Sequence, residues 1–366
     1  MGRLEAALIP HGVPADAYRG RRVLVTGHTG FKGGWLALWL LGLGAHVTGF
    51  ALDPEGEPTL FDSATLSGLV DDIRGDIRDR DALRKAWARA RPDVVFHLAA
   101  QPIVTRSYHE PVDTISTNVL GTVHVLECAR EAKQPVAVVC VTSDKCYENV
   151  EWVYGYREDD RLGGQDIYSG SKAAAEILIS SYRRTFFGDG GIAVASARAG
   201  NVIGGGDWSP HRIVPDCIRA LSAGRPIEIR YPHSTRPWQH VLEPLSGYLT
   251  LGAALLGGDA LPRQAWNFGP ARTSARSVED VVKRIIAEWG SGSWITAPAP
   301  AARHEATLLS LSIEKAETLL GWSPRWPFDT AIARTVDWYR RFGCGESAAA
   351  LCADQIAEYS RAGGHT

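Results

Sequence analysis

Residues 25–33 read Val-Thr-Gly-His-Thr-Gly-Phe-Lys-Gly, and this stretch decides the fold. It follows a short apolar segment at 22–26 and leads into an apolar, helix-like segment at 34–43. Its three glycines carry no side chain, so the backbone can approach a pyrophosphate, and the N-terminus of a helix favours that anion. A strand, a glycine turn and a helix in this order predict a dinucleotide-binding unit. The simpler alternative is a glycine turn that only links a strand to a helix.

Apolar runs of strand length alternate with helical segments through the first 205 residues. This alternation predicts an α/β protein with a Rossmann-type, doubly wound parallel sheet that is covered by helices on both faces. Ligands bind such a sheet at the carboxyl ends of its strands. The strand-like runs are 22–26, 46–52, 94–98 and 136–141, and the helical segments are 34–43, 79–90 and 116–132.

The alternation weakens after residue 205, where glycine and proline interrupt the chain repeatedly. We expect an N-terminal extension at 1–20 and an NAD-binding Rossmann domain at 21–205, to which part of 240–275 returns. Residues 206–366 are expected to form mainly a smaller, irregular α/β lobe that binds the substrate, together with C-terminal helices.

The composition excludes several classes of protein. The chain has 366 residues, 45% of them apolar, a net charge of −2 and a pI near 6.6, without a basic stripe for nucleic acid. Its six cysteines lack Cys-x-x-Cys spacing, which argues against a disulfide framework or a metal site and fits reduced thiols in the cytoplasm. The N-terminus is a poor signal peptide, and glycines interrupt the one long apolar run, so no membrane span is expected.

An acidic residue ends the second predicted strand and indicates which dinucleotide is bound. Asp53 can accept hydrogen bonds from both ribose hydroxyls of NAD and would repel the 2′-phosphate of NADP. A surface aspartate in a turn is the alternative. We expect the cofactor to contact the glycine turn, the ends of the next strands and the Tyr-Lys pair described below. The expected cofactor-binding residues are Gly27, Thr29, Gly30, Phe31, Lys32, Gly33, Asp53, Asp76, Ile77, Leu98, Ala99, Ala100, Tyr168 and Lys172.

Tyr168 and Lys172 lie one helical turn apart, so both side chains are expected on one helix face. A free tyrosine has a pKa of about 10. The charges of Lys172 and of a nicotinamide ring are expected to lower it, so that Tyr168 takes a proton from a substrate hydroxyl. Ser143 is expected to bind the same oxygen. The alternative is a chance Tyr-x-x-x-Lys on an amphipathic helix.

These residues and several longer motifs resemble the extended short-chain dehydrogenase/reductases and, within them, the nucleotide-sugar 4,6-dehydratases, with CDP-glucose as the favoured substrate. The resemblance covers nearly the whole chain after about residue 20. It rests on Thr-Gly-His-Thr-Gly-Phe-Lys-Gly at 26–33, His-Leu-Ala-Ala-Gln-Pro at 97–102, Thr-Ser-Asp-Lys-Cys-Tyr at 142–147, Arg-Ala-Gly-Asn-Val-Ile-Gly-Gly-Gly-Asp-Trp at 198–208 and Arg-Pro-Trp-Gln-His-Val-Leu-Glu-Pro-Leu-Ser-Gly-Tyr at 236–248.

The resemblance implies a reaction in three steps on one bound NAD. The hexose is oxidised at C4, water is lost across C5 and C6, and the hydride returns to C6, giving CDP-4-keto-6-deoxyglucose. Asp144 would protonate the departing C6 hydroxyl. Lys145 stands where relatives usually carry glutamate as the C5 base, so it is either a neutral base or a cation that stabilises the enolate. The expected catalytic residues are Ser143, Asp144, Lys145, Tyr168 and Lys172.

A sugar nucleotide brings two phosphates, which arginine binds well. The expected substrate-binding residues are Asn201, Arg212, Arg236, Arg303 and His304, with Glu305 beside them. Relatives are usually dimers or tetramers through the helices around 116–132 and 168–186, so a homodimer or homotetramer is expected.

Three other functions are compatible with parts of this pattern. A nucleotide-sugar 4-epimerase or decarboxylase shares the fold but generally lacks the acid and amine at 144–145. A non-catalytic sensor that binds NAD or a nucleotide would not need the reactive side chains of Asp144, Lys145, Tyr168 and Lys172. A simple NAD-linked alcohol dehydrogenase would release reduced cofactor in proportion to its product.

Overall fold

The computed structural model describes residues 13–188, 191–210, 212–258, 260–271, 275–298 and 308–362. A seven-stranded parallel sheet forms its centre, in the order β11-β6-β5-β4-β1-β2-β3. The predicted doubly wound α/β fold is therefore confirmed. The strands are β1 (Arg22–Thr26), β2 (His46–Ala51), β3 (Asp71–Arg74), β4 (Val94–His97), β5 (Val136–Val141), β6 (Ile192–Ala199) and β11 (Ala265–Phe268).

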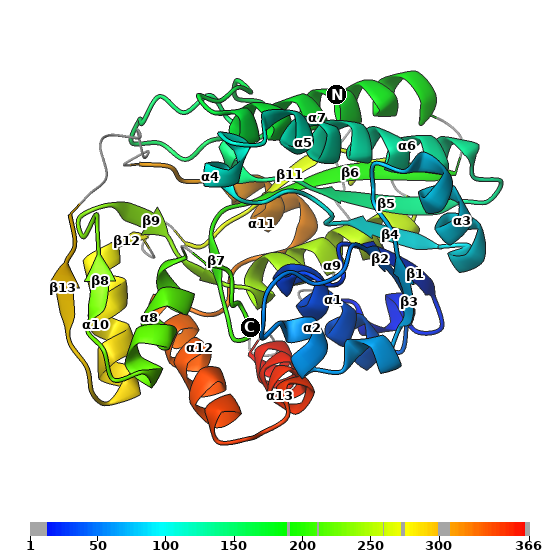
Figure 1. Cartoon of the computed structure of the whole chain (residues 1–366). Helices are drawn as coiled ribbons and strands as arrows, with labels where there is room; N and C mark the ends of the chain where they lie inside the picture. The colour runs from blue at the N-terminus through cyan, green and yellow to red at the C-terminus, as the bar shows by residue number, and fades with distance from the viewer. Residues whose placement is uncertain are drawn as a thin grey trace.

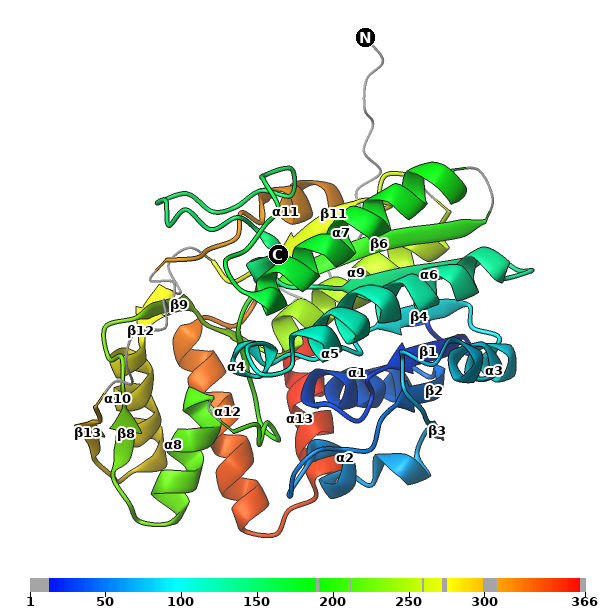
Figure 2. The same ribbon diagram turned by 45° about the horizontal axis from the view of Figure 1, so that its top comes forward.

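Helices cover both faces of this sheet, as Figures 1 and 2 show. One face carries α3 (Arg80–Ala90), α5 (Pro111–Ile115), α6 (Gly121–Glu131) and α7 (Ile167–Phe186). The other face carries α1 (Phe31–Gly42) and α9 (Leu242–Leu256).

Strand β5 shows why the sheet needs helices on both sides. All six of its residues are buried, and successive side chains enter opposite cores. Ala137, Val139 and Val141 join the core under α1 and α9. Val138 and Cys140 join the core under α3 and α6. A strand with this period-2 burial on both faces is typical of a sheet that is covered on both sides.

Two helices differ from the sequence prediction. Helix α1 begins at Phe31 rather than at residue 34, because Gly30 takes the extended N-cap conformation and the bare Gly33 and Gly34 fit into the first turn. The segment predicted as one helix over 116–132 contains a π-helical turn, η3 (Ser116–Leu120), followed by α6. Extra residues in such turns often accompany functional sites.

Beyond β6, apart from the elements that return to the central sheet, the chain forms short paired strands and packed helices, many of which lie at the lower left of Figure 1. The boundary near residue 205 and the other domain limits stay a proposal. The strand pairs are β7 (Val202–Ile203) with β10 (Gln239–His240), β8 (Ile227–Ile229) with β13 (Trp294–Thr296), and β9 (Thr235–Pro237) with β12 (Ala275–Ser277). The helices are α8 (Ile213–Ser222), α10 (Val278–Trp289), α11 (Glu314–Leu320), α12 (Phe328–Gly343) and α13 (Ala348–Arg361). The short helices elsewhere are η1 (Ala15–Ala17), α2 (Leu60–Ser63), η2 (Leu66–Gly68), α4 (Val104–Ser107) and η4 (Asp144–Cys146).

Buried polar contacts fasten both ends of the described chain to helix α9. Tyr18, within the predicted extension, is fully buried and donates a hydrogen bond of 2.5 Å to the Leu249 carbonyl. The carboxylate of Glu243 accepts hydrogen bonds from the Trp326 amide at 2.6 Å and from the Tyr359 hydroxyl of α13 at 2.6 Å. Burial raises the pKa of Glu243 to about 7 against the effect of these donors. Among the described residues, no helix is both long and apolar enough to cross a bilayer.

Candidate active site

The turn between β1 and α1 has no space for side chains at two of its glycines. A Cβ at Gly33 would lie 2.1 Å from the Gly27 carbonyl oxygen. Gly27 has a φ of 79°, and a Cβ there would lie 2.8 Å from the Ala99 amide nitrogen. The bare turn therefore packs against both α1 and the end of β4. An exposed backbone at the N-terminus of a 12-residue helix fits a dinucleotide pyrophosphate.

The next predicted cofactor residues surround this turn at the carboxyl ends of the strands. Leu98, Ala99 and Ala100 follow β4 directly beside Gly27. The Thr29 hydroxyl donates a 3.1 Å hydrogen bond to the Leu52 carbonyl. Asp53 lies two residues beyond β2, and its side chain is 88% exposed. The structure thus gathers these residues at one edge of the sheet, where a doubly wound fold binds its ligand.

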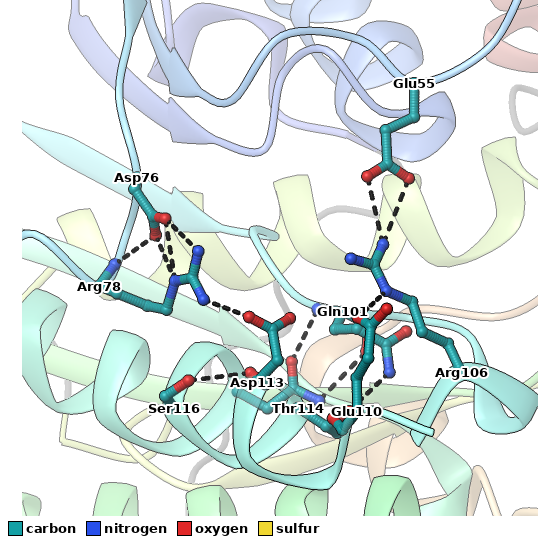
Figure 3. A network of polar contacts seen from close by, with 10 residues as sticks. Glu55, Asp76, Arg78, Gln101, Arg106, Glu110, Asp113, Thr114 and Ser116 are labelled. Atoms are coloured by element: carbon teal, nitrogen blue, oxygen red, sulfur yellow. Dashed lines mark hydrogen bonds and ion pairs between the residues drawn. The ribbon is translucent and has the colours of Figure 1, made fainter. Parts of the chain in front are cut away.

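Asp76 follows β3, and an arginine already engages its carboxylate (Figure 3). The Arg78 Nε donates to both Asp76 oxygens, at 3.0 and 2.9 Å, and Arg78 also pairs with Asp113 of α5. The pKa of Asp76 is lowered by these hydrogen bonds. Ile77 is buried against Gly121, where a Cβ would lie 2.7 Å from its side chain. The adenine contact expected of Asp76 and Ile77 stays a prediction.

Figure 3 also shows a second group of ion pairs, centred on Arg106. Arg106 of α4 lies 3.2 Å from Glu55 and 2.6 Å from Glu110. Glu55 follows β2 and Arg106 follows β4, and β1 lies between these two strands in the sheet. The pair therefore links the loops on either side of the turn. The sequence analysis did not single out these residues, because such a pairing depends on the strand order.

Ser143, Asp144 and Lys145 lie together where β5 ends. The Ser143 hydroxyl donates a 3.0 Å hydrogen bond to Asp144 Oδ1 and accepts one of 3.3 Å from the Lys145 amide. Asp144 is buried, and a Cβ at Gly200 would lie 2.7 Å from its Oδ2. Gly200 therefore makes room for this carboxylate, which the sequence analysis did not recognise. In the described part of the chain, the Lys145 ammonium has no hydrogen-bond or ion-pair partner.

Tyr168 and Lys172 lie in the first turns of α7, and both are buried, as expected for one helix face. The pKa of the Tyr168 phenol is about 12, above its ordinary value, and the lowering expected from Lys172 together with a nicotinamide ring stays a prediction. Burial raises it most, and a hydrogen bond to Ser143 lowers it. Asp144 raises it further, and Arg212 rather than Lys172 is the cation that lowers it most. The position of the pair was predictable, but the desolvation of the phenol was not.

Two lysines carry their charge into this pocket. Burial lowers the pKa of Lys172 to about 8, and the charge of Glu176 raises it. Burial also lowers the pKa of Lys32 to about 8, with Arg212 and Lys172 lowering it and Asp144 raising it. Lys32 therefore extends from the glycine turn toward the reactive side chains. The sequence predicted only a cofactor contact for Lys32, but its charge also interacts with those of Asp144 and Lys172.

Buried polar groups that influence the charge of Lys172, or are influenced by it, form a hydrogen-bonded layer. Glu176, one helical turn further along α7, pairs with Arg198 of β6 at 2.7 Å and accepts hydrogen bonds from Thr142 and Ser196. On the other side, His97 lies 2.8 Å from the Thr26 hydroxyl and 3.0 Å from the Thr122 hydroxyl. Burial, with a smaller effect of Lys172, lowers the pKa of His97 to about 3. The pocket wall is therefore rigid, with a neutral imidazole beside the lysine.

The expected substrate residues are spread over the second lobe. Asn201 is exposed beyond β6. Arg212 precedes α8 and pairs with the buried Asp207 at 3.1 Å. Arg236 of β9 stands opposite Arg276 of β12 in the strand register. Arg303, His304 and Glu305 lie outside the described residues.

The sequence model described as GDP-mannose 4,6 dehydratase matches residues 24–335. The chain belongs to this family. The resemblance that the motifs indicated is thereby confirmed, and the chain is a member of a family of nucleotide-sugar 4,6-dehydratase enzymes.

Individual relatives cover nearly the whole chain. CDP-glucose 4,6-dehydratase of Salmonella typhimurium is 46% identical over 356 residues, which is 96% of this chain and 99% of that protein. dTDP-glucose 4,6-dehydratase of Streptomyces antibioticus is 31% identical over 330 residues, 87% of this chain and 92% of that protein. The crystal structure of Thermus thermophilus UDP-glucose 4-epimerase in complex with NAD has a TM-score of 0.74 at 26% identity, covering 87% of this chain and 99% of that one.

The buried charge of Lys172 leads to a prediction about stability. Its folded pKa of about 8 lies below the unfolded value of 10.5, so below pH 8, where both states carry the charge, burial of that charge reduces the stability of the folded protein. Lys172→Met should therefore raise the free energy of unfolding at pH 7 by about 3 kcal/mol at most. The parent protein gains stability between pH 8 and 10.5, where its folded form has lost the proton, so the difference should shrink there. Urea unfolding at several pH values measures this.

The matched control is Lys283→Met, which removes an exposed lysine paired with Glu279. Its stability relative to the parent should not change between pH 7 and about pH 9. A Lys172→Met protein that is less stable than the parent at pH 7, or a difference that does not depend on pH, would contradict the buried charge.

Proposed function

We propose that this protein is an NAD-dependent CDP-glucose 4,6-dehydratase, which converts CDP-glucose to CDP-4-keto-6-deoxyglucose and water. The observation that carries this proposal is the grouping of Asp144 and Lys145 with Ser143 at the end of β5, in the pocket that also holds Tyr168 and Lys172. Oxidation at C4 needs only Ser143, Tyr168 and Lys172, and elimination needs an acid and a base as well. The relative with 46% identity that is named CDP-glucose 4,6-dehydratase supports the choice of base and sugar.

The residues at the edge of the sheet fit NAD. Gly27, Gly30 and Gly33 would present their backbone to its pyrophosphate, and Asp53 would accept the adenine ribose hydroxyls. Thr29, Phe31, Leu98, Ala99 and Ala100 would line its path, and Lys172 would bind the nicotinamide ribose. NAD supplies an acceptor for the hydrogen of C4 and returns it to C6. A member of this fold with NAD bound, at 26% identity, supports this assignment.

Proton transfer at the C4 hydroxyl is the role of Tyr168. Ser143 binds the same oxygen, because its hydroxyl lies within hydrogen-bonding reach of the phenol. The phenol, with its pKa of about 12, is protonated in this structure, so it needs a further cation beside it to act as a base near pH 7. Two groups would supply this positive charge. One is the nicotinamide ring, and the other is Lys172, whose pKa burial lowers to about 8.

Asp144 protonates the departing C6 hydroxyl, and Lys145 takes the C5 proton. Asp144 is buried, and its carboxyl group is hydrogen-bonded to the Ser143 hydroxyl, which is proposed to bind the sugar, so an acid is placed beside the reacting carbons. Lys145 is adjacent and half-buried, with its amine directed to no described partner. Stabilisation of the enolate by a charged Lys145 is the alternative that the second experiment below separates.

The diphosphate and the sugar bind between the two lobes. Arg212 and Arg236 are proposed to bind the phosphates and Asn201 the diphosphate or the sugar, with Arg303 and His304 near the nucleotide. Arg212 also affects the pKa of both Lys32 and Tyr168. A guanidinium near those groups can bind an anion and influence the reactive phenol at the same time.

A nucleotide-sugar 4-epimerase is the second candidate, because a solved structure similar to this chain, at 26% identity, is named a UDP-glucose 4-epimerase. An epimerase oxidises and reduces C4 without an elimination. It has no use for a buried acid at residue 144, so that residue favours the dehydratase.

The substrate test uses purified protein with added NAD. CDP-glucose should be converted to a product that is lighter by one water and that has the alkali-induced absorbance of a 4-keto sugar. UDP-glucose, dTDP-glucose, GDP-glucose and GDP-mannose, tested in parallel, should be poor substrates. Turnover of another nucleotide sugar would overturn the choice of CDP. Conversion of any of them to its 4-epimer without loss of water would support the epimerase.

The roles of Asp144 and Lys145 are separable in deuterated water. Asp144→Asn should lower dehydration by about a hundredfold or more, because the acid is lost, but should still exchange the C5 proton with solvent. Tyr168→Phe should lose both exchange and dehydration. Lys145→Gln should lose exchange if Lys145 is the base. Full C5 exchange in both Lys145→Gln and Lys145→Glu, measured by mass spectrometry, would exclude Lys145 as the sole base.

We propose that the protein is a homodimer, or a homotetramer built from such dimers, through the outer face of α5 and α7. Large apolar side chains are exposed there, and the two helices lie on the same face of the sheet in Figure 1. Exposed large apolar side chains on neighbouring helices are a feature of subunit interfaces. The exposed residues are Val112 at 77%, Ile115 at 43%, Ile177 at 53% and Phe186 at 52%, with Leu120 of the adjoining η3 at 51%.

The six cysteines are free thiols, which fits a location in the cytoplasm.

A charge on this face should separate the subunits. Ile177→Glu should reduce the mass measured by light scattering to that of a monomer, since a buried unpaired charge destabilises an interface. Leu69→Glu, at an apolar residue 50% exposed elsewhere, is the control and should keep the parent mass. A parent protein that is already monomeric, or an Ile177→Glu variant that keeps its mass, would contradict the proposed interface.

A further inference from the structure

Asp53, which is proposed to bind the adenine ribose, has an arginine beside it. Asp53 Oδ1 lies 3.6 Å from Arg74 Nη1. Arg74 is the last residue of β3, and it pairs in register with Ala51, the last residue of β2. The guanidinium therefore stands at the point where the loop with Asp53 begins. Neither the sequence motifs nor the proposed reaction gives Arg74 a role.

Other contacts hold Arg74 in this place. Its Nε and Nη2 donate to Asp72 Oδ2 at 3.2 and 2.9 Å, and its Nη1 donates to the Leu52 carbonyl at 3.3 Å. The guanidinium also lies over the Phe61 ring, 4.6 Å from its centre. A planar guanidinium held by a carboxylate, a carbonyl and an aromatic face keeps its orientation. Its Nη1 is directed toward Asp53 by these contacts.

The same cluster reaches the glycine turn. Asp72 Oδ1 lies 2.8 Å from His28 Nε2, and the Leu52 carbonyl accepts from both Thr29 and Arg74. Burial lowers the pKa of His28, so the imidazole is neutral near pH 7. The charges at this end of the site are therefore two carboxylates and one guanidinium. Arg74 is thus linked to the glycine turn, where the pyrophosphate would bind, through Asp72 and His28 and through the Leu52 carbonyl and Thr29.

NAD and NADP differ only in the phosphate on the adenine ribose. A carboxylate at this position accepts the ribose hydroxyls and repels the phosphate, while a nearby arginine accommodates the phosphate. This chain carries both groups 3.6 Å apart. An arginine fork is well suited to a phosphate dianion, and its contact with Asp72 occupies only one of its edges.

We propose that Asp53 and Arg74 together select the cofactor: Arg74 forms a latent site for the 2′-phosphate of NADP, and the charge of Asp53 closes it. In the parent protein Arg74 balances the charge of Asp53 and holds it toward the ribose hydroxyls. Removal of the carboxylate leaves the guanidinium facing the 2′-oxygen. The inference rests on the proposed use of a nicotinamide dinucleotide, but not on the proposed sugar substrate.

The test measures the dissociation constants of NADH and NADPH by fluorescence titration, without turnover. Asp53→Ser should shift the preference toward NADPH by about tenfold or more, the size expected for a hydrogen bond to a charged group. Asp53→Ser combined with Arg74→Gln should lose this gain. Arg74→Gln alone should weaken NADH binding a few-fold without improving NADPH. Asp53→Asn is a second variant at the exposed position, and it should shift the preference in the same direction.

Arg89→Gln is the matched control, because Arg89 pairs with Asp71 at the opposite end of the same strand. It should leave the ratio of the two constants unchanged. A gain in NADPH binding that survives in the double variant, or no gain in either Asp53 variant, would overturn the proposal. If neither dinucleotide binds the parent protein, the proposed cofactor falls as well. If NADH binds but CDP-glucose is not converted, only the proposed reaction falls.

Discussion

The site depends on one steric constraint, the absence of side chains in the turn between β1 and α1. A Cβ at Gly33 would lie 2.1 Å from the Gly27 carbonyl oxygen, and one at Gly27 would lie 2.8 Å from the Ala99 amide. Because these contacts are so close, the start of α1, the end of β1 and the end of β4 meet at one point. The loops after β2, β3 and β5 then have fixed places around it, in an order given by the sheet. The proposed cofactor site and the reactive side chains are consequences of this meeting point.

Burial disfavours the charged forms of the reactive side chains and of the lysines beside them. Burial lowers the pKa of both Lys172 and Lys32 to about 8 and raises the pKa of Tyr168 to about 12. Each shift disfavours the charged form, so the folded protein is less stable with this set of groups than with apolar ones. Perturbed groups of this kind, together in one cleft, are typical of active sites. The negative charge of Glu176, which also pairs with Arg198, offsets part of this cost at Lys172.

The sequence predicted the elements of the fold well and the contacts between them less well. Strands 22–26 and 136–141 begin and end as expected, because their apolar runs are bounded by charged or turn residues. Helix α1 begins three residues early, because the bare Gly33 fits into its first turn directly against the Gly27 carbonyl. Local spacing placed Tyr168 and Lys172 on one helix face. It could not show that Arg212 is the cation with the larger effect on Tyr168, that Gly200 makes room for Asp144, or that Arg74 stands beside Asp53, since these contacts join distant segments.

The central claim is that the hydride removed from C4 of the sugar is held on the proposed NAD and returns to C6 of the same sugar molecule. The measurement that tests it most directly follows a deuterium label placed on C4 of CDP-glucose, in the presence of an excess of unlabelled substrate. The account predicts that the deuterium is found at C6 of the same 4-keto-6-deoxy product molecule, with none passed to unlabelled molecules. Deuterium that is retained at C4, lost to solvent or spread among product molecules would contradict it.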